Sequence, residues 1–233
     1  VLSKPQKRNV YMKLLVREFY DLGVNSFGLV LFTSFFVGAV VAIQMFNNFS
    51  ASSFPIPNSF IGYATKVVLI LEFSPTIISL ILAGKVGSNV ASEIGTMRVT
   101  EQIDALEIMG VNSLNHLVLP KIIAAILFFP VLIIFSMTLS MLGGWMALMI
   151  TDLTTTETYV LGLRAFFNPF HITYALTKTV VFGFLIVSIS SFYGYYVKGG
   201  SINVGRASTQ AVVSSSIAIL IANFILTQLL LLS

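Results

Sequence analysis

Long apolar stretches alternate with short polar segments along this chain of 233 residues. A membrane-spanning helix needs about 20 mostly apolar residues, whereas strands of a membrane barrel would alternate apolar and polar positions, a pattern not visible here. The sequence therefore predicts an all-α integral membrane protein, with a single domain over residues 1–233. Five spans are expected, at about 25–49, 60–92, 116–150, 170–197 and 206–232.

An amphipathic segment, Val10 to Leu22, precedes the first span. Its apolar positions recur at helical spacing, and Lys13, Arg17 and Asp21 lie on the opposite face. Because basic edges suit the cytoplasmic membrane interface, we expect residues 1–22 to form a cytoplasmic tail and an interfacial helix. A helical extension of the first span is the alternative. No short apolar core with a cleavage site follows the basic start, so we expect no cleaved signal peptide.

The first two spans are separated by a polar break. Asn47 and Asn48 are followed by a Ser/Pro-rich segment, Ser50 to Pro57, and its prolines at 55 and 57 disfavour helix. We therefore expect a turn between these two spans.

A second amphipathic segment, residues 96–109, lies between the second and third spans. Its apolar and acidic positions form two stripes, Val99, Ile103 and Leu106 against Glu101, Asp104 and Glu107. About thirteen residues at 1.5 Å each are too short to span a membrane, and Gly110 is a natural helix stop. Since an acidic helix gains nothing from anionic lipid headgroups, a protein partner is the favoured target of this cytoplasmic helix. A solvated surface loop is the alternative.

Only 9% of the residues are charged, against about 25% in an ordinary soluble domain, which excludes a soluble single-domain enzyme. Basic residues collect on the cytoplasmic side of membrane proteins. Ten lie on one side of the predicted spans, namely Lys4, Lys7, Arg8, Lys13, Arg17, Lys85, Arg98, Lys121, Lys198 and Arg206. The other side has only Arg164, so we expect a cytoplasmic N-terminus and a C-terminus on the outer side.

Residues for enzyme chemistry are sparse. The chain has no cysteine, and Gly84 to Gly87 is too short for a phosphate-binding loop. His116 and His171 fall at predicted span starts on opposite sides of the membrane and cannot act together. The basic cluster near the N-terminus fits a membrane surface better than nucleic acid. We expect no enzyme activity, no metal site and no nucleic-acid partner.

Two charges fall inside predicted spans, Glu72 midway along the second and Lys178 near the start of the fourth. Either alone in hydrocarbon is costly, so each should face a partner or a wet cavity. A mutual ion pair and a substrate-facing site are both open. Lys66, which lies nearer the outer end, can snorkel to the interface.

Small residues recur every four positions on two spans, and such residues let helix backbones approach closely in lipid. They are Gly84, Gly87, Ser88 and Ala91 on the second span and Ala207 and Ala211 on the fifth. Packing within the chain is the default interpretation. Because five spans enclose little volume, we expect an oligomer if the protein is a transporter.

The run from Leu82 to Leu106 resembles the signature of the MlaE family. Three further segments resemble motifs of that family, namely Glu72 to Pro75, Lys178 to Gly183 and Val204 to Val213. Members are permease subunits of ABC-type lipid transporters that work with MCE proteins. The resemblance covers nearly the whole chain.

The resemblance implies a homodimeric permease in a bacterial inner membrane, with its C-terminus in the periplasm. Glycerophospholipid would pass between that membrane and a periplasmic MCE protein (MlaD-like), maintaining the lipid asymmetry of the outer membrane. Residues 96–109 would be the coupling helix, on which a separate ABC ATPase (MlaF-like) docks. ATP and Mg²⁺ would bind to that ATPase and no cofactor to this chain. A small STAS-type subunit (MlaB-like) is a further expected partner.

The same resemblance implies two sets of site residues. The candidates for lining the lipid cavity are Glu72, Lys178, Tyr63 and Asn223. The candidates for contact with the ATPase are Arg98, Glu101, Asp104 and Glu107. The chain departs from the family at Leu71, where members often have Arg, and at Asn223, where many have Asp, so its cavity would carry fewer charges.

Two other classes of function compete with this interpretation. An ion-coupled secondary transporter would use Glu72 and Lys178, but such folds usually show internal repeats, and no convincing repeat is visible. The other alternative is a scaffold that only holds partner proteins in the membrane. Dependence on an ion gradient would identify the first, and absence of lipid crosslinks would favour the second.

Overall fold

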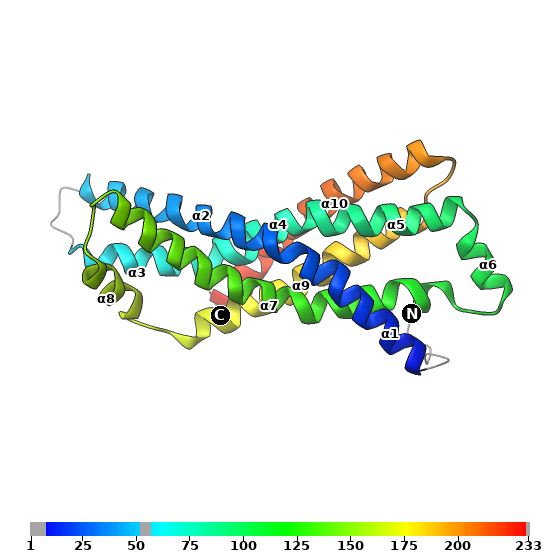
Figure 1. Ribbon diagram of the computed structural model, residues 1–233, viewed down its shortest axis with the longest axis horizontal. Helices are drawn as coiled ribbons and strands as arrows, with labels where there is room; N and C mark the ends of the chain where they lie inside the picture. The colour runs from blue at the N-terminus through cyan, green and yellow to red at the C-terminus, as the bar shows by residue number, and fades with distance from the viewer. Residues whose placement is uncertain (1–7, 52–56, 232–233) are drawn as a thin grey trace. The chain divides into compact units, whose positions relative to one another are not determined.

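The computed structural model describes residues 8–51 and 57–231 (Figure 1). Within these ranges the chain is helical and contains no strand. The helices, with η marking π-helical segments, are α1 (Arg8–Glu18), η1 (Phe19–Val24), α2 (Asn25–Ser50), α3 (Ser59–Val68), η2 (Leu69–Ile77), α4 (Ile78–Leu82), η3 (Ala83–Gly87), α5 (Ser88–Val99), α6 (Gln102–Ile108), α7 (Ser113–Ile150), α8 (Thr156–Arg164), α9 (Pro169–Tyr195) and α10 (Ser201–Leu231). Lys4, Lys7 and most of the predicted break at Ser50 to Pro57 lie outside the described residues.

Among the described residues, five helical stretches are long and apolar enough to cross a membrane. They are Tyr11–Ser50, Ser59–Val99, Ser113–Ile150, Pro169–Tyr195 and Ser201–Leu231. Their number, and the absence of strands from the described residues, confirm the predicted all-α membrane class. The second stretch continues to Val99, well beyond the predicted end near residue 92, because α5 packs along α10 and stays helical there.

The amphipathic N-terminal segment continues into the first span without a break. Helix α1 passes through η1 into α2, which is the alternative that the sequence left open. Met12 and Val16 on its apolar face remain exposed, whereas Glu18 on the other side is buried. An exposed apolar face still suits the predicted contact of this segment with a membrane interface.

The second span is a continuous rod that contains two π-helical segments, η2 and η3. Pro75 lies inside η2. Proline lacks an N–H donor and crowds the preceding turn, so the wider π-helical turn is one way to accommodate it inside a rod. Such π-helical segments occur frequently at functional sites, and Glu72 lies in this one.

The chain forms two compact units, and each is described by itself. One comprises the described parts of Val1–Phe27, Ser79–Pro130 and Thr179–Ser233, and the other comprises Gly28–Ile78 and Val131–Lys178. In the first unit α5 and α10 run side by side (Figure 1). In the second unit α3 packs against α8.

In the second unit, helices α2 and α7 approach each other through glycine. A Cβ on Gly38 would collide with the backbone carbonyl of Ser140, and one on Gly143 would collide with that of Phe35. Beside this contact the hydroxyl of Ser34 donates to that of Ser136 at 2.8 Å. Small residues thus bring two backbones together, as expected for helices packed in lipid.

Candidate functional site

The two charges expected inside the spans form an ion pair. The Lys178 amine lies 2.9 Å from the Glu72 carboxylate, so the pair that the sequence left open is present. The hydroxyls of Tyr174 and Thr76 donate to the same carboxylate, at 3.3 and 3.4 Å. Helix α9 supplies the lysine and η2 the carboxylate, because the two segments pack within the second unit.

The two partners of this pair differ sharply in exposure. The side chain of Lys178 is fully buried, and its amine lies 4.3 Å from the centre of the Tyr174 ring. The side chain of Glu72 is 41% exposed. The pair therefore presents a carboxylate at the surface of an apolar rod, while the cation that stabilises it stays inside.

The other two cavity candidates have different surroundings. Tyr63 packs edge-on against Phe60 and Phe166, and the amine of Lys66 lies 5.1 Å from its ring centre. Asn223 is half-buried on α10, a helix of the other unit. The structure therefore places Tyr63 in an aromatic cluster with Lys66 rather than in the ion pair.

The sequence suggested that Lys66 could snorkel to the membrane interface, but in the structure it does not. Its side chain is buried, and its amine donates to the backbone carbonyls of Leu163 and Ala165 at 3.1 and 2.6 Å. These carbonyls lie at the C-terminal end of α8, where a helix leaves acceptors unsatisfied and favours a cation. The lysine thus fastens α8 to α3.

The predicted helix over residues 96–109 is divided in the structure. Helix α5 ends at Val99, and a separate short helix, α6, covers Gln102–Ile108. Between them Glu101 adopts the left-handed conformation, with φ of 59°. The β-branched neighbours Val99 and Thr100 disfavour a continuous helix, which is the sequence signal that amphipathicity alone overlooked. The predicted stop at Gly110 is confirmed by its φ of 75°.

Two of the three acidic residues of this segment form an ion pair or hydrogen bonds with other side chains of the chain. The guanidinium of Arg98 binds Asp104 at 2.6 Å. The carboxylate of Glu107 accepts hydrogen bonds from Tyr195 and Ser113, each at 2.8 Å, and these bonds lower the pKa of Glu107. The acidic stripe is therefore mainly a clamp that ties α6 to α5, α7 and α9.

Two large apolar side chains are exposed at the end of the α6 region. Ile108 and Met109 are 87% and 67% exposed at its end, and the Glu101 side chain is exposed at its start. Exposed apolar residues that lie together mark a contact with a protein partner or with a membrane. This apolar tip was not among the residues predicted from the sequence.

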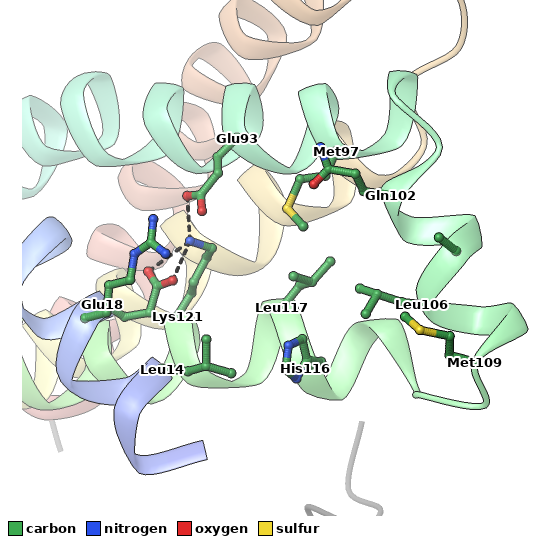
Figure 2. A pocket seen from close by; sticks show the side chains of 12 residues that line it. Leu14, Glu18, Glu93, Met97, Gln102, Leu106, Met109, His116, Leu117 and Lys121 are labelled. Carbon is green, nitrogen blue, oxygen red and sulfur yellow. Dashed lines mark hydrogen bonds and ion pairs between the residues drawn. The ribbon is translucent and has the colours of Figure 1, made fainter. Parts of the chain in front are cut away.

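A charge cluster around the buried Lys121 lies beside α6, in a pocket of about 360 Å³ (Figure 2). Figure 2 shows Lys121 pointing from α7 between Glu18 and Glu93. Its amine lies 2.8 Å from Glu18 and 2.7 Å from Glu93. Lys121 is one of the ten basic residues expected on the cytoplasmic side, and it is only 2% exposed. The acids that bury it come from α1 and α5, far apart in sequence, and no local pattern reveals this.

The predicted small residues pack mainly within the chain. A Cβ on Gly87 would lie 2.9 Å from the hydroxyl of Ser190, and Ser88 bonds Ser208 at 2.9 Å. Ala91, Ala207 and Ala211 are buried. Gly84 is different, because a Cβ there would meet nothing within 4 Å.

The long apolar helices of the described residues define a multi-pass helical membrane protein. The sequence model of the family "Permease MlaE" matches residues 15–229, and the chain belongs to this family. A probable ABC transporter permease protein of Rickettsia prowazekii is 41% identical over 98% of this chain and 87% of its own length. A similarly named protein of Rickettsia bellii is 40% identical over 94% and 84%. The chloroplastic protein trigalactosyldiacylglycerol 1 of Arabidopsis thaliana is 32% identical over 97% of this chain and 64% of its own length.

Proposed function

We propose that this chain is the non-catalytic permease subunit of an ABC transporter that moves glycerophospholipids. The match to the permease family over residues 15–229 carries this proposal. Its relatives named as ABC transporter permeases support a separate ATPase subunit. That ATPase would bind ATP and Mg²⁺, which agrees with the lack of a phosphate-binding loop sequence in this chain.

A lipid is the substrate that the protein's surface suits best. One relative is named after a diacylglycerol glycolipid. Within the chain, a half-exposed carboxylate at Glu72 lies on an apolar rod and is held by the buried Lys178. A polar group surrounded by apolar side chains suits an amphipathic substrate better than a small ion, which would need several polar ligands.

The α6 region is the proposed contact with the ATPase. Hydrogen bonds of Asp104 and Glu107 connect it to three neighbouring helices, through Arg98, Ser113 and Tyr195. The exposed tip at Ile108 and Met109 would enter an apolar groove on the partner. A movement of the ATPase would thereby reach α5, α7 and α9 together.

The remaining parts of the proposal concern assembly and location. We place the protein as a homodimer in a bacterial inner membrane, with α6 on the cytoplasmic side. A periplasmic MCE protein would exchange lipid with it and a small STAS-type subunit would join the ATPase, so that outer-membrane lipid asymmetry is maintained. This orientation is supported by the ten basic residues that lie on one side of the predicted spans.

The test is transfer of labelled phospholipid from vesicles that contain the full chain and its ATPase to a soluble MCE protein. Transfer should require ATP hydrolysis. Replacing Ile108 and Met109 with Asp should reduce co-purification of the ATPase by roughly tenfold or more, and Glu101→Lys should reduce it less. Glu157→Lys, an exposed charge reversal on α8, is the matched control and should change nothing.

Two results would contradict the proposal. Transfer that depends on an ion gradient and not on ATP would identify a secondary transporter. A complex that assembles but neither transfers lipid nor crosslinks to it would identify a scaffold.

A further inference from the structure

A second pocket, of about 440 Å³, lies in the first unit where η1 and the start of α2 face η3 and the start of α5. Its polar lining comes from both sides and includes Asp21, Asn25, Ser26, Lys85, Asn89 and Ser92. So many polar side chains are unusual at one place in a chain with only 9% charged residues. The pocket is separate from the Glu72–Lys178 pair, which belongs to the other unit.

Lys85 is the positively charged side chain that lines this pocket. Its side chain is exposed, and its amine donates to the backbone carbonyl of Asn25. A lysine ammonium carries three N–H donors, so this contact fixes the amine at the pocket while two donors remain for a ligand. The other charge, Asp21, is paired with Arg17 at 3.6 Å, which leaves the local balance positive.

Ser26 provides an independent indication of a ligand. It is fully buried and lines the pocket, yet its hydroxyl has no hydrogen-bond partner among the described residues. A buried hydroxyl without a partner is costly. A ligand with acceptor oxygens would satisfy it.

The backbone around the pocket is also adapted. Asp21 lies in the π-helical segment η1 and Lys85 in η3, and both segments are of a kind that occurs frequently at functional sites. Gly84, next to Lys85, leaves open space where a side chain would otherwise project. The small residue is therefore not needed for packing against the rest of the described chain, and it keeps room in the pocket.

We propose that this pocket binds the phosphate group of a phospholipid. An ammonium and several hydroxyl and amide donors are the groups that recognise a phosphate through charge-assisted hydrogen bonds. Lys85 belongs to the basic residues that the proposed orientation places at the cytoplasmic side, at the depth of lipid headgroups. The assignment to lipid rests on the proposed function; it adds a headgroup site at the opposite leaflet from the MCE protein, where lipid enters or leaves the permease.

The test uses thiol labelling of the full chain in detergent, without the ATPase, so that it stays independent of transport. Because the chain has no cysteine, Asn89→Cys gives a single reporter at the pocket, and Gln210→Cys on α10 is the control. Three compounds are compared: a short-chain phosphatidylglycerol, diacylglycerol with the same chains, and inorganic phosphate. The phospholipid should slow labelling of the Asn89→Cys variant by about tenfold, and diacylglycerol should not.

Three further variants and one control variant show which groups cause the slower labelling. Lys85→Met should remove most of it. Ser26→Ala should weaken it without destabilising the fold, since that hydroxyl has no partner to lose in the described chain. Gly84→Leu should fill the pocket and abolish protection, whereas Gly28→Leu, also at an open glycine, should leave it intact.

The outcomes distinguish a site for the phosphate of a lipid headgroup from a site for free inorganic phosphate. Equal protection by inorganic phosphate would overturn the assignment to lipid and leave a site for the free ion. Equal protection by diacylglycerol, or no protection, would overturn the phosphate site itself. Neither result depends on whether the assembled complex transports lipid.

Discussion

At the residue scale, the buried charges of the described residues are engaged with one another or with backbone carbonyls. Lys178 pairs with Glu72, and Lys121 pairs with two acids. Lys66 instead caps the end of α8. Because an isolated charge is costly in an apolar interior, each buried cation needs these partners. Their positions mark the places where distant segments must meet.

The unequal exposure of the Glu72–Lys178 pair leads to a prediction. Glu72→Ala leaves a fully buried ammonium without its carboxylate and should cost about 3–4 kcal/mol of stability. Lys178→Met leaves a carboxylate that is 41% exposed, and its cost should be smaller, about 2 kcal/mol, because solvent screens it. Thermal unfolding of the purified variants measures both losses of stability.

The double variant Glu72→Gln with Lys178→Met controls for loss of packing. It should be more stable than Glu72→Ala, since it removes both charges and retains an acceptor for Tyr174. Equal destabilisation by the two single variants would show that exposure does not govern the cost.

At the element scale, α6 is held by side chains rather than by its own length. It has only seven residues, and isolated helices this short are not stable in water. Arg98 holds its start through Asp104, and Ser113 and Tyr195 hold Glu107 near its end. The stability of this helix should therefore depend on the ionisation of Glu107.

The lowered pKa of Glu107 sets the sign of this dependence. A carboxyl whose folded pKa is lowered contributes stability above its unfolded pKa, near 4.3, and loses it as the pH falls through the folded value. Hydrogen–deuterium exchange of α6, corrected for the intrinsic rate, should stay slow from pH 7 to about 5 and quicken at lower pH.

Tyr195→Phe removes the main cause of the lowered pKa of Glu107. Protection of α6 at pH 7 should then be lower than in the parent protein, and less of it should be lost as the pH falls, because the folded and unfolded pKa values of Glu107 become more alike. Tyr196→Phe, its exposed neighbour, is the control. An unchanged profile in the Tyr195→Phe variant would show that this hydrogen bond does not hold α6.

At the scale of the whole molecule, α10 is the least buried of the described spans. Only 11% of its most apolar window is buried, against 33–50% in the other four. One side packs on α5 through Ser208, whereas Val213, Ile217 and Phe224 are more than half exposed. Within the proposed homodimer, this uncovered face is where a second copy would pack.

A cysteine crosslink tests this placement. In the chain, which has no cysteine of its own, Ile217→Cys should crosslink two copies in the membrane with a short bifunctional reagent. Phe184→Cys, 47% exposed on α9, is the control and should not. Crosslinking from Phe184→Cys alone would place the dimer contact on α9 instead.

Local patterns predicted a large part of the fold. Apolar length was sufficient to predict five spans, because hydrocarbon forces each backbone to satisfy its own hydrogen bonds. The division at Val99–Glu101 and the three π-helical segments were not predicted, since they depend on packing with other helices. Of the site residues, Glu72 and Lys178 were visible because a charge within an apolar run stands out.

The sequence by itself determined the class of protein, its spans and the identity of its intramembrane charges. Only the tertiary structure decided which charges meet. Lys121 was expected only as one of the basic residues on the cytoplasmic side, whereas in the structure Glu18 of α1 and Glu93 of α5 pair with it. Ser26 of α2 and Lys85 of η3 are distant in the sequence, yet they line one pocket. The physical reason is that burial within a helix follows from local hydropathy, whereas an ion pair or a pocket depends on side chains that are distant in the chain.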